Sequence, residues 1–239
     1  MNAYDIERVE TGIPGLDELM GKGIPRGNSV ILSGCAGSGK TTFGVQFLVN
    51  GIKNDEPGIF VSLEEYLPNI KRNMLKFGWN LAYLQEENKL RLMRLDMSEF
   101  GSSSSGNMDI GMFSDAVFPA IKEINAERVV IDPISVIRLM YKSDFKFRVD
   151  MSGLQQSLRE LNCTTIMVLD AVSGFMSRYN VEEFVSQGVI IFHYIKRSYT
   201  RMRGLEIWKM QGTKHSENVH SMEIAHSGLR VYSGVPVSL

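Results

Sequence analysis

The stretch Gly34–Thr41, with the sequence GCAGSGKT, constrains the fold of this chain more than any other segment. It fits the pattern G-x-x-x-x-G-K-[ST], whose glycines let successive backbone N–H groups turn inward around phosphate oxygens. Residues 28–33 before it have the composition of a short buried strand, and residues 42–49 after it that of a helix. This strand, loop and helix predict a nucleotide-binding P-loop, although a glycine-rich turn of purely structural purpose is the alternative.

The residues of the loop have separate expected roles. The N-terminus of the following helix carries partial positive charge, which stabilises a bound phosphate. Lys40 is expected to bring its ammonium group to the β- and γ-phosphates, and Thr41 to offer its hydroxyl to Mg²⁺. We predict that the nucleotide is held by nine residues: Gly34, Cys35, Ala36, Gly37, Ser38, Gly39, Lys40, Thr41 and Thr42.

Length and composition narrow the class of protein. The 239 residues suffice for one large α/β domain and are short for two. The formal charge of −1 gives no overall argument for nucleic acid or an anionic membrane. The two cysteines, Cys35 and Cys163, make no disulfide framework, and no signal-like start or apolar run of about 18 residues occurs. We expect a cytoplasmic protein without a membrane partner.

Helical and strand-like segments alternate after the P-loop. Apolar, β-branched runs predict strands at 59–63, 90–95, 128–132 and 164–169. Apolar residues at helical spacing predict helices near 16–20, at 68–77, at 113–125 and around 154–161. The remainder changes to strand patterns at 189–195, 205–210, 222–225 and 229–232. We therefore predict one α/β domain over residues 1–239, a mainly parallel twisted sheet flanked by helices with antiparallel strands added near the C-terminus.

Two short segments carry local predictions. The run 101–106, GSSSSG, is expected to form a surface loop and not a linker between domains. Residues 180–183, NVEE, have the pattern of a capping box at the start of a helix.

Three carboxylates are candidates for chemistry at the phosphates. Asp132 ends a buried strand, where an unpaired carboxylate is costly, so we predict that it joins Thr41 at Mg²⁺. Capping of the turn at Pro133 is the alternative role. Glu64 and Glu65 follow the strand after the P-loop helix, at the sheet edge where α/β proteins bind ligands. Because like charges raise a neighbour's pKa, the pair suits a general base, with solvated surface residues as the alternative.

Two basic stretches with interleaved aromatic residues leave nucleic acid open as a partner. From 196 to 214 the chain has six Lys or Arg and one acid, Glu206, with Tyr199 and Trp208 among them. The second stretch, within 138–148, contains Arg138, Tyr141, Lys142, Phe145, Lys146, Phe147 and Arg148. Each could contact nucleic acid, meet the phosphates of a nucleotide on a neighbouring subunit, or form solvated loop faces, which is the default for such charge runs.

Six blocks of sequence, spread almost end to end, carry a resemblance to a known family. They are TGIPGLDE at 11–18, the P-loop, VSLEE at 61–65, VVID at 129–132, VEEFVSQGVI at 181–190 and KMQGTKHS at 209–216. The chain resembles a single-domain KaiC-like ATPase of the RecA superfamily, of the kind common in archaea. The P-loop alone indicates only the superfamily, whereas the last two blocks are close to specific for KaiC.

The resemblance implies a RecA-type core that binds ATP and Mg²⁺ in a ring, often hexameric, with nucleotide at the subunit interfaces. It implies that Glu64 and Glu65 are catalytic. In the family's K-M-R-G block, the Lys and Arg reach the γ-phosphate of the neighbouring subunit. Lys209 matches that lysine, Gln211 stands where arginine is expected, and Lys214 could help Lys209.

Other positions also depart from the family pattern, namely Asp170 and the short tail after Tyr232. Together with Gln211, they predict slow hydrolysis with ATP binding retained. The leading hypothesis is a regulatory or signalling ATPase that hydrolyses ATP slowly in a homo-oligomeric ring and acts on a protein partner not identified by the sequence. The alternatives are a DNA-acting RecA/RadA-like ATPase and a non-hydrolysing assembly protein in which nucleotide sets the state of the ring.

Overall fold

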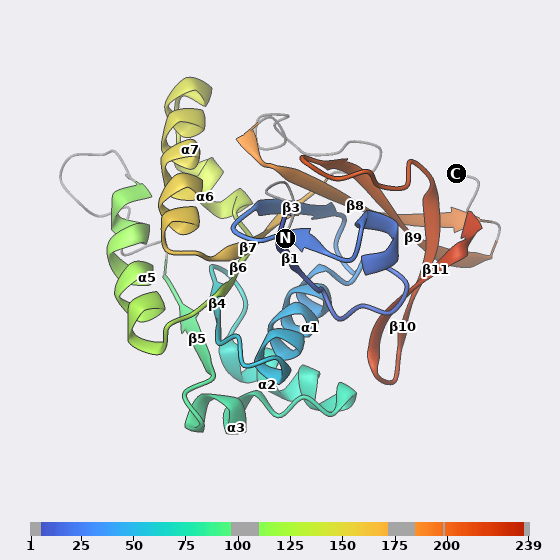
Figure 1. Ribbon diagram of the computed structural model, residues 1–239, viewed down its shortest axis with the longest axis horizontal. Coiled ribbons are helices and arrows are strands. Elements are labelled where there is room, and N and C mark those ends of the chain that lie inside the picture. Colours follow the sequence, from blue (N-terminus) through green and yellow to red (C-terminus); the bar gives the residue numbers. More distant parts are fainter. Residues whose placement is uncertain (1–5, 97–109, 172–184, 198, 237–239) are drawn as a thin grey trace.

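The computed structural model describes residues 6–96, 110–171, 185–197 and 199–236. A nine-stranded sheet runs through it in the order β11-β10-β9-β8-β3-β7-β6-β4-β5 (Figure 1). Every neighbouring pair from β8 to β5 is parallel. These strands are β3 (Ser29–Gly34), β4 (Gly58–Ser62), β5 (Leu90–Arg94), β6 (Arg128–Asp132), β7 (Thr164–Asp170) and β8 (Gly188–Arg197). Their carboxyl ends therefore meet at one edge of the sheet.

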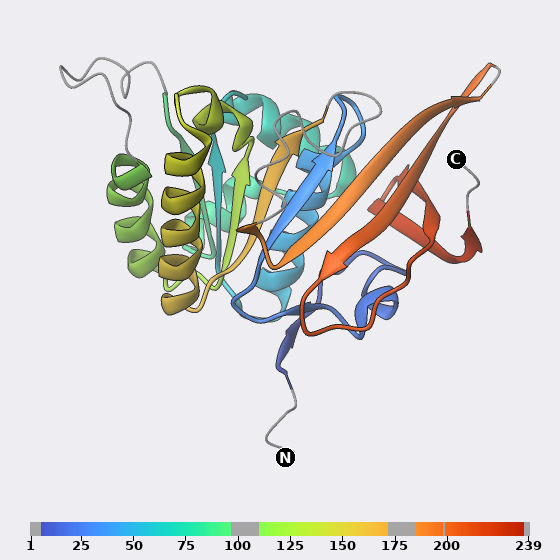
Figure 2. The ribbon, with the colours of Figure 1, turned by 90° about the horizontal axis from the view of Figure 1, so that it is seen from above.

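An antiparallel extension follows the parallel part. It consists of β9 (Thr200–Met210), β10 (Val219–Ala225) and β11 (Gly228–Pro236), added in turn to β8. The long hairpin of β8 and β9 reaches beyond the rest of the sheet (Figure 2). A separate two-stranded sheet pairs β1 (Arg8–Val9) with β2 (Ile24–Pro25) close to the N-terminus.

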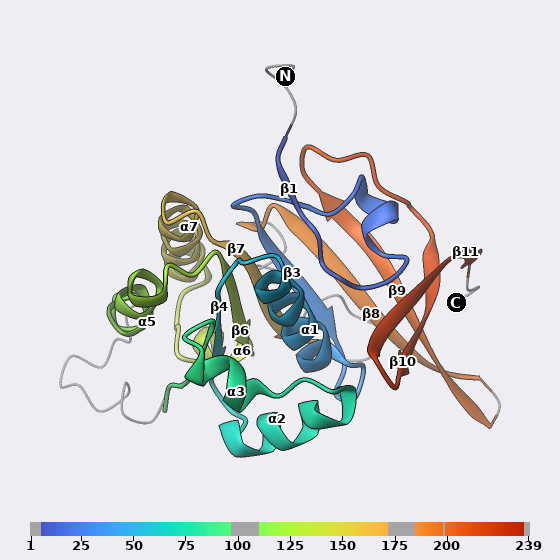
Figure 3. The ribbon, with the colours of Figure 1, turned by 60° about the horizontal axis from the view of Figure 1, so that its bottom comes forward.

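Helices cover both faces of the parallel sheet (Figure 3). One face carries α1 (Lys40–Lys53), α2 (Leu67–Met74) and α3 (Leu81–Glu86), and the other carries α5 (Ile110–Ile124), α6 (Ser135–Leu139) and α7 (Asp144–Glu160). Two 3₁₀ turns, η1 (Asp17–Met20) and η2 (Leu75–Phe77), complete the helical segments that the structure describes. None of the helices in these described residues is both long and apolar enough to cross a bilayer.

Successive side chains along each parallel strand point to opposite faces of the sheet and contribute to two separate hydrophobic cores. On β3, Val30 and Leu32 pack on the α1 side, whereas Ile31 packs against the α5 and α7 side. The same division holds on β6, where Val130 joins the first core and Val129 the second. Strands buried on both faces must be apolar throughout, which is why their sequences read as continuous apolar runs.

The predicted fold class is confirmed: the structure is α/β, with a mostly parallel sheet, flanking helices and antiparallel C-terminal strands. Two helices were not predicted, the short α3 and α6, and the C-terminal strands are longer than expected. The serine-rich loop 101–106 and the capping box 180–183 lie outside the described residues, so both stay predictions.

A buried ion pair fastens β6 to the P-loop helix. The side chain of Arg128, 1% exposed, donates from Nε to Glu56 Oε2 at 2.7 Å and from Nη1 to the carbonyl of Phe47 in α1 at 2.8 Å. Arg26 also binds Glu56. Burial alone would raise the pKa of Glu56, but the hydrogen bonds from Arg26 and Arg128 outweigh it and lower that pKa. The pair thus holds the strand that ends in Asp132 against the helix that begins at Lys40.

Glu56→Gln is expected to lower the free energy of unfolding at pH 7 by about 3 kcal/mol, because it leaves the buried Arg128 guanidinium without its counter-charge. A carboxylate with a lowered pKa stabilises the fold above its unfolded pKa of about 4.3 and loses this effect as the pH falls through the folded value. The difference between variant and wild type should therefore shrink in acid. Urea unfolding at pH 7 and below pH 4 measures it, with the exposed Glu86→Gln as control. Equal stabilities at pH 7 would contradict this account.

Candidate nucleotide-binding site

The P-loop lies between the carboxyl end of β3 and the start of α1. Gly37 and Gly39 have φ angles of 78° and 110°, in the region that residues with a β-carbon rarely adopt. The side-chain oxygen of Ser38 is buried and finds no hydrogen-bond partner within the described residues. A buried hydroxyl of this kind is costly unless a ligand satisfies it, so the loop fits a phosphate group.

Lys40 points back into the loop instead of toward solvent. The residue is 8% exposed. Its Nζ donates to the carbonyls of Gly34 at 2.7 Å and Cys35 at 3.1 Å. It also lies 3.1 Å from Oδ1 of Asp170, at the end of β7. The ammonium group is therefore held at the mouth of the loop, where the sequence pattern requires it.

Thr41 and Asp132 are brought together as predicted for a metal site. Thr41 Oγ1 donates to Asp132 Oδ2 at 2.7 Å, from adjoining α1 and β6. Burial raises the pKa of Asp132 to about 6, opposed by the hydrogen bond from Thr41 and the charge of Lys40. A divalent cation would stabilise the charged form of this buried carboxylate. A hydroxyl and a carboxylate side by side are oxygen ligands of the kind that Mg²⁺ prefers. The two residues therefore fit Mg²⁺, and the metal role stays a proposal.

The two glutamates after β4 differ in environment. Glu64 is exposed, whereas Glu65 is half-buried, and burial raises the pKa of Glu65. The raised pKa agrees with the prediction in direction, but its cause is burial and not the proximity of Glu64. Ser62 Oγ donates to the carbonyl of Glu65 at 2.7 Å and fixes the turn. Burial is the main cause of the raised pKa of Asp132, and the charges of Asp170 and Glu65 add to it.

The candidate residues from the end of β9 lie away from the P-loop of their own chain. Lys209 pairs in register with Val189 near the start of β8, and its Nζ donates to the Ser186 carbonyl at 2.7 Å. Burial lowers the pKa of Lys209. Gln211 and Lys214 are exposed and follow β9 at the edge of the sheet opposite the P-loop. One chain therefore does not bring Lys209, Gln211 and Lys214 to its own P-loop.

The basic stretch on the β8–β9 hairpin is partly directed at the P-loop. Arg203 donates to the Gly37 carbonyl at 3.2 Å and lies 4.5 Å from the centre of the Tyr194 ring. Arg201 lies over the same ring, at 5.3 Å. Tyr199 and Trp208 remain exposed. Through Arg203 the hairpin contacts the candidate nucleotide site. This contact favours a role for Arg203 at the nucleotide over a role in binding nucleic acid.

The second basic stretch is not a continuous surface. Tyr141 and Phe147 are buried in the core beneath α5 and α7. Arg138, 9% exposed, lies over the Phe147 ring and forms an ion pair with Asp144. The hypothesis of a basic, aromatic face at 138–148 is therefore wrong for these three side chains, which pack into or against the core, whereas Phe145 of the same stretch is exposed.

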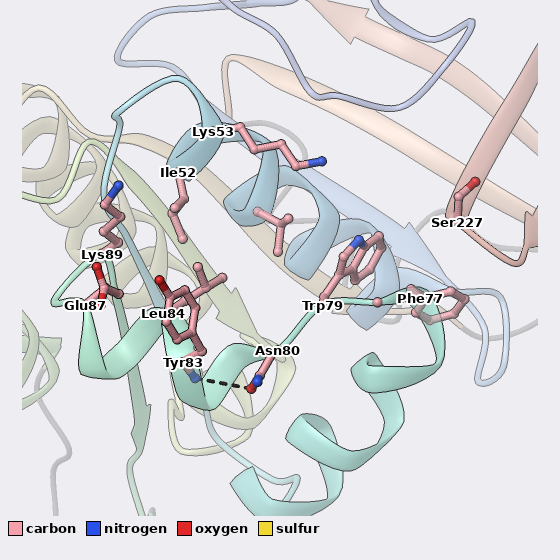
Figure 4. A pocket seen from close by; sticks show the side chains of 12 residues that line it. Ile52, Lys53, Phe77, Trp79, Asn80, Tyr83, Leu84, Glu87, Lys89 and Ser227 are labelled. Carbon is pink, nitrogen blue, oxygen red and sulfur yellow. Dashed lines mark hydrogen bonds between the residues drawn. The ribbon is translucent and has the colours of Figure 1, made fainter.

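A cavity of about 510 Å³ lies at the other end of α1 and is separate from the P-loop (Figure 4). Its wall includes Ile52 and Lys53 from the end of α1, Trp79 and Tyr83 from around α3, and Ser227 from the turn between β10 and β11. No P-loop residue lines it. The candidate nucleotide site is therefore formed by the P-loop and the carboxyl ends of the parallel strands, and this cavity is not part of it.

Asp170 lies at the same edge of the sheet as the P-loop, and no role was predicted for it from the sequence. It was noted only as a departure from the KaiC family pattern. Asp170 ends β7 just as Asp132 ends β6, and its carboxylate contacts Lys40. The signal that identified Asp132, an acid directly after a buried apolar run, is also present at 166–170. A search for every acid that ends a predicted strand would have found it.

The sheet order, the P-loop between β3 and α1, and the Thr41–Asp132 pair define a P-loop nucleotide-binding protein with a RecA-like fold. The comparisons with known proteins narrow this class. A family model described as "ATPase: KaiC" matches residues 9–235, and the chain belongs to that family.

Curated relatives of this chain are named circadian clock oscillator protein KaiC. The one from Parasynechococcus marenigrum (strain WH8102) is 36% identical over 230 residues, which cover 95% of this chain and 45% of the relative. The one from Synechococcus elongatus (strain ATCC 33912 / PCC 7942 / FACHB-805) is 35% identical over 95% of this chain and 44% of its own length. The chain thus spans less than half of each of these proteins.

A solved structure agrees over the whole of its length. The crystal structure of a KaiC-like protein from Pyrococcus horikoshii OT3 has a TM-score of 0.83 and 36% sequence identity to this chain. The match covers 95% of this chain and 100% of that one. The resemblance to a KaiC-like protein of archaeal type is therefore confirmed.

Proposed function

We propose that this chain binds ATP with Mg²⁺ at its P-loop and hydrolyses it slowly, as a single domain in a homo-oligomeric, hexameric ring. The observation that carries the proposal is the arrangement of Lys40, Thr41 and Asp132 at one sheet edge, with the Thr41 hydroxyl 2.7 Å from the Asp132 carboxylate. Membership of the KaiC ATPase family supports it. A regulatory role in the cytoplasm, exerted through a protein partner, is part of the proposal.

The chemistry needs little from the protein beyond position and charge. Backbone N–H groups of Gly34 to Thr42 and the ammonium of Lys40 bind phosphate oxygens, while Thr41 and Asp132 hold Mg²⁺. The cation neutralises charge on the phosphates when it is bound. Glu65, half-buried with a raised pKa, takes a proton from the attacking water, and Glu64 beside it orients that water.

The ring supplies the remaining charge. Because the edge with Lys209, Gln211 and Lys214 lies opposite the P-loop, a head-to-tail contact between subunits presents it to the next subunit's nucleotide. Gln211 can donate hydrogen bonds but has no charge. Lys209, assisted by Lys214, therefore supplies the positive charge at the next subunit's nucleotide. A lysine neutralises a transferring phosphate less well than the guanidinium fork of arginine, which accounts for slow turnover.

Gel filtration with ATP and with ADP, coupled to a phosphate-release assay, tests the assembly. We expect an ATP-dependent shift to the mass of a ring together with slow release of phosphate. A ring that forms with ATP but releases no phosphate would support the non-hydrolysing alternative. Turnover that is stimulated by single-stranded DNA, with the stimulation lost in Arg201→Ala, would support the DNA-acting one, for which the exposed Tyr199 and Trp208 remain available.

Lys40→Ala is expected to weaken MgATP binding by about 10- to 100-fold, because it removes a charge-assisted hydrogen bond to phosphate. Calorimetric titration of the wild type and the variant measures the difference. Lys53→Ala, at the other end of the same helix, is the matched control and should bind MgATP like the wild type. Equal affinity in Lys40→Ala and the wild type would contradict the P-loop assignment.

A further inference from the structure

Asp170 lies beside the P-loop, at the carboxyl end of β7. It is the last residue of β7, and β7 lies beside β3 so that Asp170 is in register with Gly34, the first residue of the P-loop. The backbone N–H that follows it, from Ala171, donates to the Gly34 carbonyl at 3.1 Å. The position of Asp170 is therefore fixed by the parallel ladder and not by a free loop.

One ion pair and one hydrogen bond orient the carboxylate of Asp170. Its Oδ1 lies 3.1 Å from Lys40 Nζ, and its Oδ2 accepts from Ser135 Oγ, at the start of α6, also at 3.1 Å. The Asp170 side chain is 51% exposed, whereas that of Lys40 is 8% exposed. The ion pair thus joins a buried cation to an anion at the surface of the site.

Three oxygen atoms lie around the ammonium group of Lys40. An ammonium group has three N–H donors. Lys40 donates to the carbonyls of Gly34 and Cys35 and forms an ion pair with the carboxylate of Asp170. A phosphate that binds Lys40 competes with these three oxygens for the ammonium group. Asp170 is the acceptor that carries a full negative charge, so it competes with phosphate most directly.

We propose that Asp170 is a charge gate on the P-loop: it holds Lys40 in the nucleotide-free protein and disfavours nucleotides in proportion to their phosphate charge. This inference deepens the proposed function and rests on it. Two effects act in the same direction. Before binding, the ion pair must be broken, and after binding, a carboxylate remains beside the terminal phosphate and repels it. Asp170 is thus a positioning and specificity residue that acts through Lys40.

The gate predicts a difference between ATP and ADP. A triphosphate brings more negative charge to the loop than a diphosphate, so its binding should gain more from the removal of Asp170. Salt should reduce the gain, because the Asp170 side chain is half exposed and its field is screened over about 8 Å at physiological ionic strength. A purely structural role for Asp170 predicts neither difference, since loss of a structural contact would weaken both nucleotides alike.

The test is calorimetric titration of the wild type, Asp170→Asn and Asp170→Glu with MgATP and with MgADP, at low and high salt. We expect Asp170→Asn to bind MgATP about 3- to 10-fold more tightly than the wild type, with a smaller change for MgADP. The gain should shrink at high salt. Asp170→Glu keeps the charge and should bind both nucleotides like the wild type.

The outcomes separate the gate from the function on which it rests. A wild type that binds MgATP, with neither Asp170→Asn nor Asp170→Ser binding it more tightly, overturns the gate and leaves the proposed function standing. Failure of every variant to bind either nucleotide overturns the proposed function and the gate with it. Asp170→Ser, a smaller neutral variant, is measured beside Asp170→Asn, and thermal unfolding of both confirms that they are folded. Tighter MgATP binding in either neutral variant supports the gate.

Discussion

Replacing both Glu64 and Glu65 by Gln is expected to leave MgATP bound while slowing its hydrolysis by about 10²- to 10⁴-fold, the contribution of a positioned general base. The two positions should not contribute equally. Glu65 is half-buried, its pKa is raised by burial, and its charge acts on Asp132, whereas Glu64 is exposed. We therefore expect Glu65→Gln alone to reproduce most of the loss.

Single-turnover phosphate release and calorimetric titration together measure this prediction, because only the first should change. Glu64→Gln is the neighbouring comparison and Glu86→Gln, on the exposed side of α3, the remote control. A double variant that turns over ATP at the wild-type rate would place the base elsewhere, with Asp170 the first residue to examine. A double variant that no longer binds MgATP would instead assign the pair to binding.

The parts of the fold that depend on local pattern were predictable from the sequence. Buried parallel strands need continuous apolar runs, and the P-loop needs its glycines, so β3, β6 and β7 could be placed within a residue or two. Short helices were not predicted. The helix α3 has only six residues, and its signal was a single cap, Asn80, whose side chain accepts from the Tyr83 N–H at 3.2 Å. Too few periodic positions were available to identify it.

The candidate site was predictable where chemistry is concentrated in one residue type at a strand end, as at Asp132. It was not predictable where the role of a residue depends on whether its side chain points into the core or toward solvent. The aromatic residues at 141 and 147 alternate with basic ones, and the same composition would suit an exposed face or a core. Tertiary packing buries both of them, Phe147 on α7 and Tyr141 just before that helix. Likewise, the contact of Asp170 with Lys40 depends on β7 lying next to β3, a strand order that no local pattern specifies.

Lys209→Ala is expected to slow hydrolysis by about 10²- to 10³-fold in an assembled ring, below the 10³- to 10⁵-fold effect of an arginine finger because lysine lacks the fork. The physical reason lies in the geometry of the single chain. Lys209 pairs with Val189, on the edge opposite the P-loop, so in the proposed ring its charge would act on a neighbour's nucleotide and not on that of its own chain. MgATP affinity should change less than the rate, since the charge matters most as the phosphoryl group transfers.

Mixing two inactive variants tests whether the site is shared. Lys209→Ala subunits keep the glutamates, and Glu64→Gln/Glu65→Gln subunits keep Lys209, so an interface with the right order contains one intact half from each. In a head-to-tail ring assembled at random from equal amounts, about one quarter of the interfaces have that order, and about one quarter of the wild-type rate should return. Each variant mixed with itself is the control. If subunits exchange, as labelled protein would show, and no activity returns, Lys209 does not act in trans and the whole site must lie within one chain.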